Sequence, residues 1–238
     1  MKSILMALLL ASAGVSAAPF TPEQEARIRE LIRETLVQDP AILDEAAESW
    51  QRQQEADYQS NLNQLIKRQH QILFESPTSP RLGTKAPALT LVLFTDYNCP
   101  YCKRLDPEVM KLLGNHPDLA LIIKFLPFKG ESATAAARLA ISQWQRQPDA
   151  FLPLHQTLMG KRGMLDETSI RAALKATGNR ALSMSDESAR EVNINLQLAR
   201  ELGVQGTPAL LIGNRLLPGA VSYEQLEQTL QDAREDAS

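Results

Sequence analysis

The spacing of hydrophobic positions changes along the chain, and each spacing predicts a different kind of element. From 21 to 74 they recur every three or four residues, which indicates helices with one apolar face. Residues 89–95 and 119–126 are two nearly continuous apolar runs, typical of buried strands. Helical spacing returns from 132 to 202, and two short apolar runs follow between 210 and 217. The pattern predicts an α/β protein preceded by an N-terminal helical arm.

The arm is predicted to contain two helices. Thr21 and Gln24 match a capping box around Pro22, so the first helix should begin there. The pair at 39–40, Asp-Pro, should end it. Because no Gly or Pro follows until position 77, residues 40–74 can form a second helix about 50 Å long.

A single apolar stripe on this arm, residues 19–74, has to be buried somewhere. Its heptad-like spacing is short and diluted by glutamines, so the coiled-coil signal is weak. Two alternatives stay open. The arm joins copies of the chain into a homo-oligomer such as a trimer, or it folds back over the main domain. The Ser- and Pro-rich stretch 76–83 is predicted to be the loop between arm and main domain.

At the C-terminal end, local signals predict a hairpin and a last helix. Gly213-Asn214 lies between the two short apolar runs and predicts a two-residue turn. Ser222 and Gln225 match a second capping box, so a helix should begin there. After the arm, the predicted order is strand, helix, strand, a helical block, then two strands and a helix.

Residues 1–17 have the pattern of a secretory signal peptide. Lys2 precedes an apolar core at 4–10, and small residues lead to a cleavage position after Ala17. The apolar core is much shorter than the roughly 20 residues needed to span a bilayer. We expect an exported, soluble, periplasmic protein in a compartment where disulfides persist.

Composition and charge narrow the function classes. The chain has 238 residues, 44% of them hydrophobic and 22% charged, as folded domains do. Its net charge of -3 gives no overall positive field, so we expect no nucleic-acid partner.

The candidate chemistry lies in two cysteines, Cys99 and Cys102. They follow the strand at 89–95 and begin a predicted helix that runs toward 113. The free N–H groups and the dipole at a helix N-terminus stabilise a thiolate, so Cys99 is expected to attack. Cys102, one turn further, is placed to resolve the mixed disulfide. The pattern predicts a redox-active dithiol.

Other interpretations of this pair are half of a metal site or a plain disulfide. No second cysteine pair exists, and neither His70 nor His116 has a metal-finger spacing from the first. We expect His70 on an exposed face of the arm and His116 in the turn after the helix. His155 is expected to be a packed helix residue and not a ligand.

Taken together, four segments resemble the DsbA-like group of thioredoxin-fold thiol-disulfide oxidoreductases, most closely its suppressor-of-copper-sensitivity (ScsC-type) branch. They are 94–104 (FTDYNCPYCKR), Pro107, 206–208 (GTP) and the arm around 36–47. The first and third are specific in combination, and the arm is less so.

This resemblance implies a thioredoxin fold made of 84–130 and 204–238, with a helical domain inserted at 131–203. It implies a cis peptide bond between Thr207 and Pro208 beside the cysteines, where an extended client segment pairs with the backbone. It implies no cofactor. The implied partners are exported proteins with thiols or disulfides and a membrane redox partner.

Around the cysteines, the resemblance makes Pro100, Tyr101, Thr207 and Pro208 the residues that shape the site. The family often carries a buried acid six residues before the first cysteine, but this chain has Leu93 there. This position therefore supplies no acid for deprotonation of Cys102. Lys124 is the nearby ionisable substitute, and the alternative is that Lys124 is a surface lysine.

Three functional hypotheses follow. Tyr101 and Thr207 are residue types that the resemblance associates with isomerase and ScsC-like members, which favours disulfide isomerisation or reduction over oxidation by a DsbA-like dithiol oxidase. The second hypothesis is periplasmic Cu(I) binding by Cys99 and Cys102 as soft thiolate ligands. The third is that the arm is an assembly module and the redox domain incidental.

Overall fold

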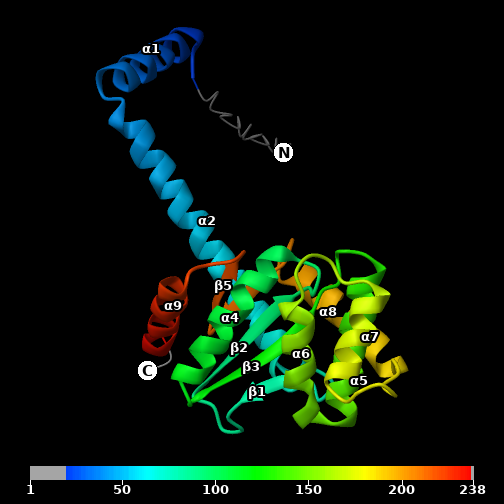
Figure 1. Cartoon of the computed structure of the whole chain (residues 1–238). Helices are drawn as coiled ribbons and strands as arrows, with labels where there is room; N and C mark the ends of the chain where they lie inside the picture. Colours follow the sequence, from blue (N-terminus) through cyan, green and yellow to red (C-terminus); the bar gives the residue numbers. More distant parts are fainter. Residues whose placement is uncertain (1–19, 237–238) are drawn as a thin grey trace, which may run out of the picture. The chain divides into compact units, whose positions relative to one another are not determined.

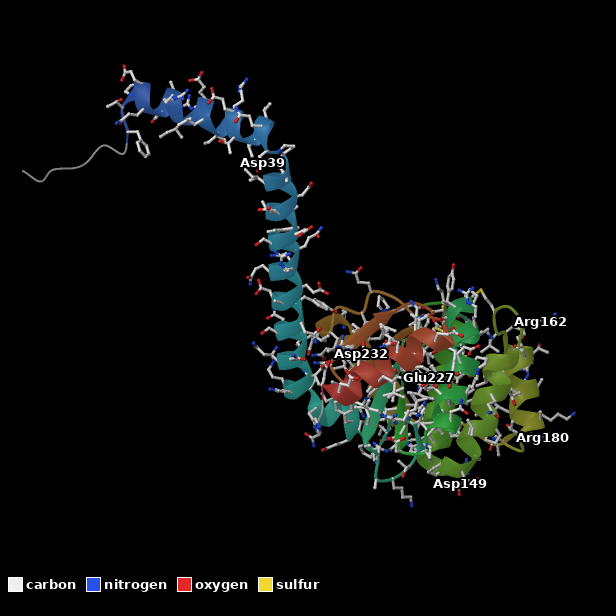
Figure 2. All side chains as sticks on the ribbon, turned by 90° about the vertical axis from the view of Figure 1, so that its left-hand side faces the viewer. Asp39, Asp149, Arg162, Arg180, Glu227 and Asp232 are labelled. Atoms are coloured by element: carbon white, nitrogen blue, oxygen red, sulfur yellow. The ribbon has the colours of Figure 1, made fainter. Side chains whose placement is uncertain are left out.

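The computed structural model describes residues 20–236, so the predicted signal peptide lies outside the described residues. The chain divides into two compact units between Ala56 and Asp57. The first contains α1 (Pro22–Gln38) and the beginning of α2 (Ala41–Arg68). The predicted capping box starts α1. Asp39, labelled in Figure 2, ends this helix. No residue of α1 is buried, so this helix contributes nothing to a hydrophobic core.

The second unit begins with the end of α2 and with α3 (His70–Phe74). The long helix that the sequence allowed is interrupted at Gln69, whose φ of -98° and ψ of 13° are not helical. Leu62 and Leu73 are buried in the core of this unit. The last third of the predicted arm therefore packs with the main domain.

A five-stranded sheet forms the centre of the second unit, in the order β1-β3-β2-β4-β5. β2 and β3 are parallel, and the other neighbours are antiparallel. The predicted strands and the turn at Gly213-Asn214 are confirmed. The strands are β1 (Arg81–Gly83), β2 (Leu89–Thr95), β3 (Leu119–Phe125), β4 (Ala209–Ile212) and β5 (Arg215–Pro218).

The prediction of a loop over 76–83 is wrong for its last three residues, because β1 pairs with β3 there. β1 has only three residues, too few for a periodic signal. Gly83 ends it at φ +88°, and a Cβ there would lie 2.3 Å from the Leu119 carbonyl oxygen. Only glycine fits this close approach.

Helices cover both faces of the sheet (Figure 1). One face, here called the cysteine face, carries alternate residues such as Leu91, Leu93 and Ile123 and packs in one cluster with both cysteines. The opposite face carries Val92 and Ile122. The helices after α3 are α4 (Pro100–Asn115), α5 (Glu131–Arg146), the short 3-10 helix η1 (Pro148–Ala150), α6 (Phe151–Gly160), α7 (Glu167–Ala176), α8 (Asp186–Glu201) and α9 (Tyr223–Glu235).

The cluster of the cysteine face includes buried residues of α4, α5, α6 and α9, whereas the opposite face meets α3, the end of α2 and much of α8. In Figure 1, α5, α6 and α7 form a group beside the sheet. Among residues 20–236, no helix has both the length and the hydrophobicity required to cross a membrane.

Candidate active site

Cys99 lies where the turn after β2 becomes helix α4. The Asp96 side chain accepts a hydrogen bond from the Asn98 N–H at 2.7 Å, and the Cys99 N–H donates to the Asp96 carbonyl at 3.1 Å. Cys99 is the N-cap, with extended backbone (φ -83°, ψ 120°), and Pro100 is the first helical residue. No side chain caps this end. Its N–H groups are therefore available to a thiolate on Cys99.

The loop before β4 lies opposite this sulfur. The Cys99 thiol donates a hydrogen bond to the Thr207 carbonyl oxygen, with the two atoms 3.2 Å apart. The Thr207–Pro208 peptide bond is cis, as the resemblance implied. The geometry thus agrees with what the resemblance implied, that these distant segments meet at Cys99.

Cys102 is one turn further along α4, and both cysteines are free thiols. The Asp96 N–H donates to the Cys102 sulfur at 3.4 Å. Burial raises the pKa of Cys102 from an ordinary value of 9.0 to about 12, although hydrogen bonds from Thr95, Thr207 and the Asp96 backbone oppose the rise. The two sulfurs therefore differ: one lies at an uncapped helix start, and the other holds its proton at neutral pH.

A groove of about 430 Å³ borders Cys99. Two large apolar side chains on its walls are exposed, Tyr101 at 56% and Phe128 at 48%. The Arg104 guanidinium lies over the Tyr101 ring, 4.9 Å from its centroid. The groove thus offers apolar surface and the loop before Pro208 next to a reactive sulfur. Its lining residues are Cys99, Pro100, Tyr101, Phe128, Lys129, Gln205, Gly206 and Thr207.

Asp96 and Asn98, which sequence reasoning missed, hold this loop in place. The Asp96 carboxylate also accepts the Lys129 N–H at 2.9 Å. Burial raises the pKa of Asp96, and the backbone hydrogen bonds that it accepts oppose this. The Asn98 amide donates to the Lys129 carbonyl and the Ser132 hydroxyl, and its oxygen accepts the Leu165 N–H. Asx-type turn residues before a cysteine were the available signal.

Neither position considered for proton transfer to Cys102 fits that role. Leu93 is buried in the cysteine-face cluster and carries no acid. Lys124 is wholly buried, so its interpretation as a surface lysine is wrong. It also lies on the opposite face, where its ammonium donates to the Ile72 carbonyl and the Ser79 hydroxyl at 2.7 and 2.6 Å. Its substitute role for Cys102 is therefore ruled out by strand alternation.

The histidines lie where the sequence predicted. His70 is exposed at the start of α3, and His116 ends α4, where it contacts Glu227 of α9 at 3.0 Å. His155 is buried and packed in α6. Within residues 20–236, His, Cys, Asp and Glu side chains form no group of three or more that could hold a metal ion.

Comparison with known families gives two matches. The DSBA-like thioredoxin domain matches residues 90–231, more than half of the chain. The copper resistance protein ScsC N-terminal domain matches residues 24–57.

Solved structures of two similar proteins agree with these family matches. The catalytic domain of Proteus mirabilis ScsC is 48% identical, with 72% of this chain and 98% of that chain covered and a TM-score of 0.71. A periplasmic thioredoxin-like protein from Salmonella enterica serovar Typhimurium is 49% identical over 70% of this chain and 95% of that chain, with a TM-score of 0.68.

Among curated proteins, disulfide bond formation protein D of Bacillus subtilis (strain 168) is 22% identical over 169 residues, which cover 64% of this chain and 75% of that protein. Fold, cysteine geometry and relatives lead to one assignment. The chain belongs to the DsbA-like thioredoxin family, and it is a thiol-disulfide oxidoreductase of the ScsC type.

Proposed function

We propose that this oxidoreductase acts on disulfides of exported proteins in the periplasm, with Cys99 as the attacking sulfur, and that it isomerises or reduces them in preference to oxidising them. The observation that carries the proposal is the contrast between the two sulfurs. Both thiols are buried, but Cys99 lines the groove at an uncapped helix start, whereas burial raises the pKa of Cys102 to about 12.

In the proposed reaction the Cys99 thiolate attacks one sulfur of a client disulfide. A Cys99–client disulfide forms, and the other client sulfur leaves as a thiolate. In isomerisation, another client thiolate attacks the client sulfur of this bond and releases the Cys99 thiolate, so no net oxidation occurs. In reduction, the Cys102 thiolate attacks Cys99, the second client thiolate leaves, and the protein's dithiol becomes a disulfide. A membrane redox partner would then reduce that disulfide.

The state of Cys102 favours the first outcome. Because its pKa is about 12, little of the Cys102 thiol is ionised at neutral pH, and resolution by Cys102 is slow. The mixed disulfide then lasts long enough for a client thiolate to attack. Tyr101, Phe128, Thr207 and Pro208 would hold the client segment in the groove meanwhile.

The direction is tested by two assays on the full mature chain. The equilibrium of the Cys99/Cys102 pair with glutathione measures its redox potential, and refolding of a scrambled-disulfide protein should be accelerated. A strongly oxidising pair with no isomerase activity would show that the protein is an oxidase.

Cu(I) binding is a second candidate use of the same pair. Two adjacent free thiols are soft ligands, and the N-terminal match is to a copper resistance protein domain. A Cys102→Ala variant should trap mixed disulfides with clients, and Cys99→Ala should not. Absence of adducts together with tight Cu(I) binding by the reduced wild type would favour the metal function.

We also propose that the arm assembles copies of the chain. In the first unit the exposed large apolar side chains are Phe20, Leu31, Ile32, Val37, Leu43 and Trp50. A second copy, as in a trimer, would bury such a stripe. Light scattering should give a multiple of the chain mass for the mature protein and a monomer after deletion of residues 19–56. The deletion must stop there because Leu62 and Leu73 belong to the core.

A further inference from the structure

Three buried polar side chains, Tyr97, His155 and Asp106, form a hydrogen-bonded set on the cysteine face. The Tyr97 hydroxyl lies 2.9 Å from His155 Nδ1, and His155 Nε2 lies 2.9 Å from Asp106 Oδ1. Tyr97 and His155 are fully buried, and Asp106 is 6% exposed. No step of the proposed reaction uses these contacts.

This hydrogen-bonded set connects residues on both sides of the two cysteines. Tyr97 precedes Cys99 by two positions, and Asp106 follows Cys102 by four, one turn further along α4. His155 belongs to α6, which contributes no cysteine. One imidazole therefore holds the active-site loop with one nitrogen and the active-site helix with the other.

The donors and acceptors available in this hydrogen-bonded set decide where its protons lie. A carboxylate only accepts, so His155 Nε2 must donate to Asp106. In a neutral imidazole Nδ1 then accepts the Tyr97 hydroxyl proton, and all three groups are satisfied. The rings are also packed: Tyr97 stacks on Phe125 with centroids 4.9 Å apart, and His155 stacks on Phe151 at 5.3 Å.

A second contact joins the same two helices. The Lys103 ammonium donates to the Lys161 carbonyl just after α6 at 2.6 Å, and to the Leu158 and Met159 carbonyls at 3.3 and 3.4 Å. The turn of α4 that follows Cys102 is thus bound to α6 by Lys103 and by Asp106. α6 therefore contacts the first half of α4 at two positions.

We propose that His155 is a positioning residue for disulfide exchange: by binding Tyr97 and Asp106 it fixes Cys99 relative to the Thr207 carbonyl and the groove. The inference rests on the proposed role of Cys99 as the attacking sulfur. Cys99 Sγ is 3.2 Å from the Thr207 oxygen, and a misplacement of about 1 Å can reduce a reaction rate about a hundredfold.

Two amide substitutions at His155 separate its hydrogen bond to Asp106 from its hydrogen bond to Tyr97. The terminal amide of His155→Gln reaches the place of Nε2 and keeps the Asp106 bond, whereas His155→Asn reaches the place of Nδ1 and keeps the Tyr97 bond. Both are made in the Cys102→Ala full chain, and formation of a mixed disulfide with a small disulfide-containing peptide is followed by mass spectrometry over a range of peptide concentrations.

We expect both variants to lower the limiting rate by about tenfold to a hundredfold while the half-saturating peptide concentration stays constant, because the groove is intact. Ser79→Ala is the matched control. It removes the buried hydrogen bonds of the Ser79 hydroxyl to Lys124 and Glu191 on the opposite face and should lower stability without changing the limiting rate.

If His155 variants do not fold, Tyr97→Phe deletes one oxygen and leaves the ring packing, and the same fall in rate is expected. Wild-type limiting rates for every folded variant would overturn the inference. Failure of the Cys102→Ala parent itself to form an adduct would instead contradict the proposed function, so the two failures are distinguishable.

Discussion

The two faces of the sheet each bury a hydrogen-bonded set of ionisable side chains, but only one set adjoins the cysteines. On the cysteine face, Asp106, His155 and Tyr97 connect α4, α6 and the active-site loop. On the opposite face, Lys124 and Glu191 are 3.4 Å apart and bind hydroxyls of the segment before β1.

The difference is one of location. Both sets satisfy buried polar groups and so stabilise the fold. The Lys124 set joins α3, β3 and α8, and none of its members neighbours a cysteine in the sequence. We therefore expect disruption of the opposite face to change stability alone, and disruption of the cysteine face to change both stability and exchange rate.

The largest expected effect is on the opposite face. Lys124→Met leaves the buried Glu191 carboxylate without its cation, which should lower the free energy of unfolding by about 3–5 kcal/mol in urea denaturation. Adding Glu191→Gln removes the stranded charge and should restore most of this loss. The folded single variant should exchange disulfides at the wild-type rate, and a slow folded variant would remove the contrast between the faces.

Tyr97→Phe is the corresponding change on the cysteine face. His155 Nδ1 loses its buried partner, so unfolding should become easier by about 1–3 kcal/mol, measured by the same urea titration. Here the rate of mixed-disulfide formation should fall as well. If Tyr97→Phe lost stability but formed the mixed disulfide at the wild-type rate, the cysteine face would affect stability alone, as the opposite face does.

Titration of Cys102 gives a smaller effect that reports on the cysteine face alone. Its folded pKa is raised to about 12 from 9.0, so the folded state holds this proton more tightly than the unfolded state. The resulting stability is complete below pH 9 and is lost as pH rises toward 12. Relative to the Cys102→Ala variant, the reduced wild type should lose about 1 kcal/mol by pH 10. Parallel stability curves for the two proteins would contradict the buried, protonated Cys102.

The smallest effect is expected outside both faces. Trp50 is 65% exposed in the first unit. Trp50→Ala should therefore change the free energy of unfolding of the second unit, measured by urea titration, by less than about 0.5 kcal/mol. Its effect should appear in the mass of the assembly by light scattering. A large shift of the urea midpoint would mean that this residue supports the core of the second unit.

Local signals predicted several elements of the second unit. The apolar run at 89–95, the helix start at Cys99 and the Gly213-Asn214 turn each depend on neighbouring residues, and all are present. The meeting of Thr207 with Cys99 came from the family resemblance, because no local rule connects segments so far apart.

Both buried polar sets escaped sequence analysis because their partners are distant in sequence. His155 lies 58 positions from Tyr97 and 49 from Asp106, and Glu191 lies 67 from Lys124. A lysine in an apolar run is usually a surface residue, since burial without a partner is costly. Only the fold brings the compensating carboxylate to it.

The central claim is that Cys99 attacks and Cys102 waits as a protonated thiol. It is tested most directly by measuring, for Cys102→Ala and Cys99→Ala separately, the rate of mixed-disulfide formation with the same small disulfide at neutral pH. We predict that Cys102→Ala reacts about a hundredfold faster or more, and that the slow rate of Cys99→Ala rises about tenfold per pH unit toward pH 10. Equal rates, or a faster Cys99→Ala protein, would contradict the assignment of the two sulfurs.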